Sequence, residues 1–235
     1  MIKSLFWKEW CEHRWKLAYG CVLLMGFVAV GLRSRIVQDE VIFVFAAVGG
    51  SILMALLVGM GLVAAERSDG SLGMLLALPV RSWKIFAVKM AMGTLVCVGP
   101  IVGCMVLSLV MAAGREMSAS RIIELYLGGV AFGIVMLVWM VAFGIRQPSE
   151  ARAGLVGIAV FMVWVFIIFL SEVFVRPPYH LSRLSLVITP FGFFEGTLDR
   201  SYDILPKVIP VQLVIGFCLM MWAAYRFGKL GRAKE

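Results

Sequence analysis

The sequence predicts an all-α integral membrane protein with six transmembrane helices. Of its 235 residues, 62% are hydrophobic and 15% are charged, whereas soluble domains have about 45–50% apolar and about 25% charged residues. Six apolar blocks are long enough to cross a hydrocarbon core of about 30 Å. No linker or low-complexity tract divides the chain, so residues 1–235 are expected to form a single membrane domain. The blocks are Leu17–Leu32, Val41–Ala65, Ile85–Ala113, Ile122–Ile145, Ala153–Ser171 and Val208–Tyr225.

An amphipathic helix is expected over residues 1–16, before the first block. Trp7, Trp10 and Trp15 alternate there with charged side chains. Tryptophan is enriched where the membrane meets water, and a helix with charged and aromatic faces lies in the headgroup layer. The segment is therefore predicted to form a separate interfacial helix.

The connection between the second and third blocks, residues 66–80, is unusually apolar for a loop. Ser68 or Asp69 can cap a helix that Pro79 must end. Such a helix would have about nine residues and a length of roughly 13 Å, too short to span a bilayer. An apolar helix of this size needs a partner protein or the membrane surface to cover it. Its apolar residues are Leu72, Met74, Leu75, Leu76 and Leu78.

The third and fourth blocks contain pairs of glycines four residues apart. Gly99 and Gly103, and Gly129 and Gly133, present small faces that allow a neighbouring helix to come close. Lys89, near the start of the third block, is expected to reach lipid phosphates. The blocks therefore predict close helix packing.

The longest polar connection, residues 172–207, precedes the last block. It contains an apolar stretch that Pro190 and Gly192 interrupt, which excludes a seventh span. Short re-entrant helices dipping into the outer leaflet are expected instead.

The charges predict the orientation. If both termini are cytoplasmic, the inner segments hold fourteen of the 22 Lys and Arg residues and six of the 14 Asp and Glu residues, so the whole net charge of +8 lies inside. This is the distribution of the positive-inside rule. The prediction is a multi-pass protein of the cell (inner) membrane. The spread of bases over four segments argues against a nucleic-acid partner.

Several chemistries find no support in the sequence. It contains no H-E-x-x-H, G-x-S-x-G or phosphate-binding G-x-x-x-x-G-K-[ST] motif, and no cysteine or histidine spacing typical of a metal site. The chain is therefore expected to be no enzyme and to bind no cofactor or metal itself. Ionisable residues near the middle of the spans are almost lacking, which argues against ion-driven transport.

Residues 64–84 closely resemble the loop between the second and third spans of ABC type-2 transporter permeases, in which E-R-x-x-G-x-L-x-x-L-L-x-L-P-V-x-R forms the coupling helix. One departure is that Arg81 and Lys84 lie on either side of the usual basic position. The other matching residues are Glu66, Arg67, Gly70, Leu72, Leu75, Leu76, Leu78, Pro79 and Val80.

The resemblance implies a partner and a set of roles. A separate nucleotide-binding ATPase subunit would bind ATP and Mg and would dock on Glu66–Pro79, with Asp69 among the coupling residues. A second permease copy or a homologous permease would complete the complex. Residues 1–16 would be the elbow helix, and Phe191, Phe193 and Phe194 would form an outer gate in the re-entrant loop.

Two other readings stay open. A membrane anchor or assembly factor that recruits a cytoplasmic ATPase could carry the same loop without transporting anything. Alternatively, the loop could form an interfacial helix that has no partner. The apolar spans favour a hydrophobic or amphipathic cargo.

Overall fold

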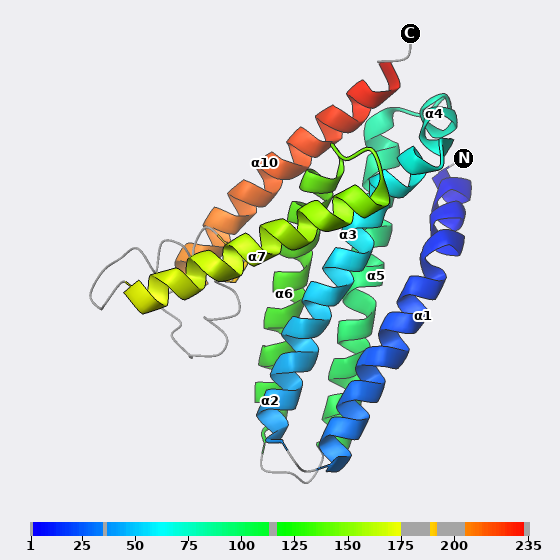
Figure 1. Cartoon of the computed structure of the whole chain (residues 1–235). Helices are drawn as coiled ribbons and strands as arrows, with labels where there is room; N and C mark the ends of the chain where they lie inside the picture. Colours follow the sequence, from blue (N-terminus) through cyan, green and yellow to red (C-terminus); the bar gives the residue numbers. More distant parts are fainter. Residues whose placement is uncertain (1, 35–36, 113–116, 175–188, 192–204, 233–235) are drawn as a thin grey trace.

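Figure 1 shows a computed structural model of the chain, which describes residues 2–34, 37–112, 117–174, 189–191 and 205–232. These residues form helices and turns, with no strand among them. Six helical segments are long and apolar enough to cross a membrane, which confirms the predicted number. The protein therefore has the character of a multi-pass helical membrane protein.

Each predicted block overlaps one of these segments, although the bounds differ by a few residues. The second segment consists of α2, the π-helical turn η1 and α3 in succession, and the short helix α4 lies in the connection that follows. The elements are α1 (Ile2–Ser34), α2 (Asp39–Val44), η1 (Phe45–Gly49), α3 (Gly50–Ser68), α4 (Ser71–Leu76), α5 (Ser82–Met111), α6 (Ala119–Gly144), α7 (Glu150–Phe174) and α10 (Leu205–Arg232).

The separate interfacial helix expected over residues 1–16 is not observed. α1 is one helix of 33 residues, about 50 Å long at 1.5 Å per residue. No glycine or proline lies between Trp7 and Leu17, so nothing in the sequence stops the helix before the apolar block. Trp7 and Trp15 are exposed on its outer side.

α1, α3, α5 and α6 form the packed core of the bundle (Figure 1). The glycines in α6 allow close contact with the second segment, as predicted. A Cβ atom at Gly129 would lie only 2.8 Å from the carbonyl oxygen of Ala47. The hydroxyl of Ser51 donates a hydrogen bond of 2.7 Å to the carbonyl oxygen of Gly129. These contacts hold the two helices together.

α7 and α10 run obliquely across the core helices and expose much of their apolar surface (Figure 1). Such surface needs a lipid or protein cover. The exposed residues include Leu155, Met162, Val163 and Phe166 on α7 and Leu213, Val214 and Phe217 on α10.

The start of α1, the end of α10 and the whole of α4 lie at one end of the bundle, which we call the termini end (Figure 1). The start of α2 and the start of α6 lie at the other end, the opposite end. This arrangement agrees with an even number of spans. It places α4 beside the beginning of the chain.

Candidate functional site

The connection between α3 and α5 reverses the chain at Gly70. Gly70 has φ 73°, a left-handed conformation that glycine adopts without steric cost. α4 follows with six residues, so it is shorter than predicted. Asp69 is the C-cap residue of α3, and Ser68 ends that helix. The prediction that either residue caps α4 is therefore wrong, because the glycine separates them from it.

α4 is covered on one side by the protein itself. Leu72 and Leu75 are buried in the hydrophobic core, and Leu76 is half-buried against it. Met74 of α4 and Leu78, in the turn directly after it, point outward, with 79% and 40% of their surfaces exposed, and together form what we call the outward face of α4. The helix thus presents a narrower apolar face than the sequence indicated. Pro79 is exposed beside that face.

Glu66, the first residue of the predicted coupling segment, does not reach the surface. It lies in the last turn of α3 with 3% exposure, and Glu9 of α1 and Lys89 of α5 are fully buried beside it. The ammonium of Lys89 lies 2.8 Å from Oε1 of Glu9 and 3.0 Å from Oε2 of Glu66. One lysine therefore joins the carboxylates of two other helices. We call these three residues the buried triad.

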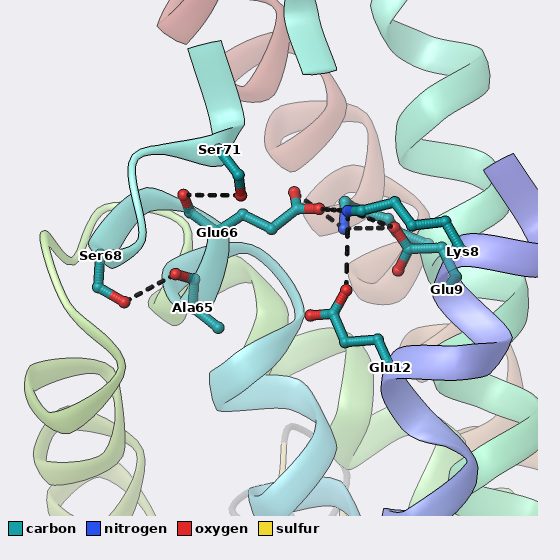
Figure 2. Close-up of polar contacts among 8 residues, drawn as sticks. Lys8, Glu9, Glu12, Ala65, Glu66, Ser68 and Ser71 are labelled. Atoms are coloured by element: carbon teal, nitrogen blue, oxygen red, sulfur yellow. Dashed lines mark hydrogen bonds and ion pairs between the residues drawn. The ribbon is translucent and has the colours of Figure 1, made fainter. Parts of the chain in front are cut away.

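Lys8 extends the buried triad toward solvent (Figure 2). Its ammonium donates a hydrogen bond to Glu66 and lies 3.7 Å from both Glu9 and Glu12. Two lysines thus face three carboxylates. Because buried charges are costly unless they are paired, these contacts make the burial of Glu66 and Glu9 tolerable.

The sequence holds a signal for this arrangement in one face of α1. Glu9 and His13 lie one helical turn apart on a face of α1 that is buried near both ends of the helix and half-buried at Lys16 and Leu17. Residues four apart share a face of a helix, so the stripe could have been recognised. The expectation that Lys89 reaches lipid phosphates is wrong, because it points into the bundle. The remaining buried residues of this face include Leu5, Gly20, Leu24, Val28 and Leu32.

Arg67 and Lys16 tie the termini end to the start of α7. Arg67 donates weak hydrogen bonds of 3.5 and 3.4 Å to the carbonyl oxygens of Arg146 and Gln147 in the turn after α6. The ammonium of Lys16 lies 3.9 Å from Glu150 of α7. Arg67 therefore fixes the end of α3 to a neighbouring turn, although it is exposed.

Glu9, Glu12 and His13 are the described residues that come closest to a metal-binding group. Their donor atoms lie within 4.8 Å of one another, and both ring nitrogens of the buried His13 have no hydrogen-bond partner among the described residues. However, the ammonium groups of Lys8 and Lys89 already contact the two carboxylates. A cation would have to compete with these lysines, so the group is a poor metal site.

Of the predicted outer gate, only Phe191 can be placed. Its ring packs against Phe132 of α6 and Phe161 of α7, with centroid distances of 5.3 and 5.8 Å. Both partners lie near the middle of their helices. Gln212 of α10 donates a hydrogen bond of 3.1 Å to the carbonyl oxygen of Thr189. The segment 189–191 therefore contacts three spans.

The other gate residues, Phe193 and Phe194, lie outside the described residues, and so does most of the expected re-entrant loop 172–207.

No family model matches the chain, and no curated protein matches it. The resemblance of residues 64–84 to a permease loop therefore stays a hypothesis.

Proposed function

We propose that the chain is the transmembrane permease subunit of an ABC type-2 exporter in the cell (inner) membrane, with both termini in the cytoplasm. A separate nucleotide-binding ATPase subunit would bind ATP and Mg and would dock on α4. A second copy of the chain or a homologous permease would complete the route, covering part of the exposed apolar surface of α7 or α10.

The observation that carries this proposal is the outward face of α4. Met74 and Leu78 are exposed at the termini end, which the positive-inside rule puts in the cytoplasm. Buried Leu72 and Leu75 anchor the helix to the core. α4 thus presents an exposed apolar surface while its other side is packed against the core. A docking element requires both, because a loosely held helix could not transmit movement to the spans.

Movement would start at α4 and reach the spans on either side of it. Closure of the ATPase would press on α4, whose neighbours α3 and α5 belong to the packed core. Rigid-body shifts of packed helices of this kind are common in switching proteins. Phe191, packed against α6 and α7, would respond at mid-span, where substrate would pass.

The experiment that tests docking replaces only the exposed side chains. The double variant Met74→Asp, Leu78→Asp puts charges on the outward face of α4 and leaves Leu75 in the core. We expect an ATPase that co-purifies with the unaltered chain to stop co-purifying with the double variant. The variant Arg152→Asp, exposed at the start of α7 and outside the predicted docking segment, should retain the ATPase. Undiminished binding by the double variant would refute the docking role.

A membrane anchor would use the same face, and a second measurement distinguishes it. In liposomes, an exporter subunit should stimulate the ATP hydrolysis of its partner, because transport and hydrolysis are coupled. An anchor would bind the ATPase and leave the rate unchanged. Binding without stimulation would therefore favour the anchor.

A further inference from the structure

The buried triad joins three spans directly beneath α4. Glu9 comes from α1, Glu66 from α3 and Lys89 from α5, and the closest contacts of Lys89 are 2.8 and 3.0 Å. The side chains of Glu9 and Lys89 are fully buried, and that of Glu66 is 3% exposed. The contacts are therefore hard to exchange for solvent contacts when the helices move.

Glu66 belongs both to the buried triad and to the turn that leads into α4. Its side chain bonds to Lys8 and pairs with Lys89, while its carbonyl oxygen accepts a hydrogen bond of 3.4 Å from the hydroxyl of Ser71, the first residue of α4 (Figure 2). Gly70, which allows the chain to turn, lies between them. The backbone carbonyl of Glu66 thus contacts the first residue of α4, while its side chain links the end of α3 to α1 and α5.

We propose that Glu66 is a positioning residue that links the movement of α4 to α1 and α5 through Lys89 and Glu9. This inference rests on the proposed function, because it takes α4 to be the docking element. It adds a route by which pressure of the ATPase on α4 is transmitted to other helices, which we call the force route. Pressure on α4 would reach α1, which is distant in sequence, as well as the adjoining helices α3 and α5.

Charge balance makes one variant especially informative. Glu66→Met removes a carboxylate and keeps a side chain of similar length. Lys89 then remains paired with Glu9, and Lys8 with Glu12, so two cations face two anions. The variant should fold, because it leaves no buried charge without a partner. Glu66→Gln keeps one oxygen that can accept from Lys89 and serves as the conservative rescue.

The first measurement needs only this chain, reconstituted in vesicles of phosphatidylethanolamine and phosphatidylglycerol. In Glu66→Met we expect the backbone amides of α4 to exchange hydrogen about tenfold faster, while those of α6 keep their protection, because local opening can be decoupled from global unfolding. Glu66→Gln should lie between Glu66→Met and the unaltered protein. Equal exchange of α4 in all three would overturn the inference.

The second measurement adds the ATPase that binds the unaltered chain. Glu66→Met should bind it with the same affinity and stimulate its hydrolysis about tenfold less, a loss within the range of coupling between sites. Glu40→Met at the opposite end is the matched control and should behave like the unaltered chain. Full stimulation by Glu66→Met would refute the force route while leaving docking intact.

The two proposals fail differently. If no ATPase binds the unaltered chain, the proposed function is lost, and the force route that rests on it is lost as well. The exchange measurement would then still decide whether Glu66 positions α4.

Discussion

The two ends of the bundle each carry a buried cation with two acidic partners, but only one end keeps those acids from water. At the termini end, Lys89, Glu9 and Glu66 are all buried. At the opposite end, the guanidinium of Arg121 lies 3.2 Å from Glu40 and 3.1 Å from Glu124. The side chains of these two acids are 50% and 32% exposed. Similar distances thus occur in very different surroundings.

The two ends differ in what happens to the acids when their ion pairs break. The acids around Arg121 can return to water, so their pairing contributes little to stability. Glu9 and Glu66 cannot, so they depend on Lys89. The opposite-end cluster joins α2 to α6, whereas the buried triad joins three spans. Because its charges are buried, the buried triad is a structural link between spans, whereas the Arg121 cluster is a surface contact.

The largest effect is expected from Lys89→Met, which leaves Glu9 and Glu66 buried with only Lys8 nearby. Breaking a buried ion pair from one side costs about 3–5 kcal/mol. Denaturant titration in detergent micelles should show a fall in unfolding free energy of this size. Lys84→Met, a lysine on the same helix over the ring of Trp83, is the control. If Lys89→Met lowers the unfolding free energy no more than the control does, the buried triad is no more important for stability than an exposed contact.

A double-mutant cycle should sharpen the comparison. We expect Glu9→Gln and Lys89→Met to be strongly non-additive, with an interaction energy of about 1–3 kcal/mol, because their atoms are in direct contact. The cycle of Glu40→Gln and Arg121→Met should give less than about 1 kcal/mol, as for exposed pairs. The unfolding free energies of the single and double variants give both values. Equal interaction energies would mean that burial does not set the strength of these pairs.

Arg121→Met alone should have a smaller effect than Lys89→Met. Its former partners can be hydrated, so the loss of unfolding free energy should be about 1 kcal/mol or less. The same denaturant titration measures it. A loss comparable to that of Lys89→Met would show that Glu124 and Glu40 depend on Arg121 despite their exposure.

The smallest effect concerns salt. Raising the ionic strength to about 1 M shortens the screening length to about 3 Å, and this weakens exposed pairs far more than buried ones. The interaction energy between Glu40 and Arg121 should therefore fall, while that between Glu9 and Lys89 should persist. Repeating both cycles in high salt tests this. Parallel losses at both ends would indicate that water reaches the buried triad.

The sequence predicted the parts of the fold that depend on composition and local pattern. The six apolar blocks and the close approach at Gly129 follow from residue size and hydropathy, and the structure confirms them. The short helix before Pro79 was also expected, although it begins only after Gly70 and already ends at Leu76. Features that depend on a single segment can therefore be predicted from the sequence.

What depends on distant segments was not predicted. In the sequence, Lys89 is an isolated base near the start of a span. Only the packing of α1 and α3 against α5 shows that it pairs with two carboxylates. Likewise, the burial of Leu72 and Leu75 depends on the core beneath α4. Periodicity identifies the inner face of a helix, but it does not identify the side chain opposite.

The unbroken course of α1 has a practical consequence for anyone who labels or trims this protein. A probe rigidly attached near Trp7 would report the tilt of the whole first span, because no hinge intervenes before Leu17. Conversely, deleting the first turns would remove Glu9 and strip Lys89 of a counter-charge deep in the bundle. The first turns of α1 thus contribute to the folded bundle, and truncating them should lower its stability.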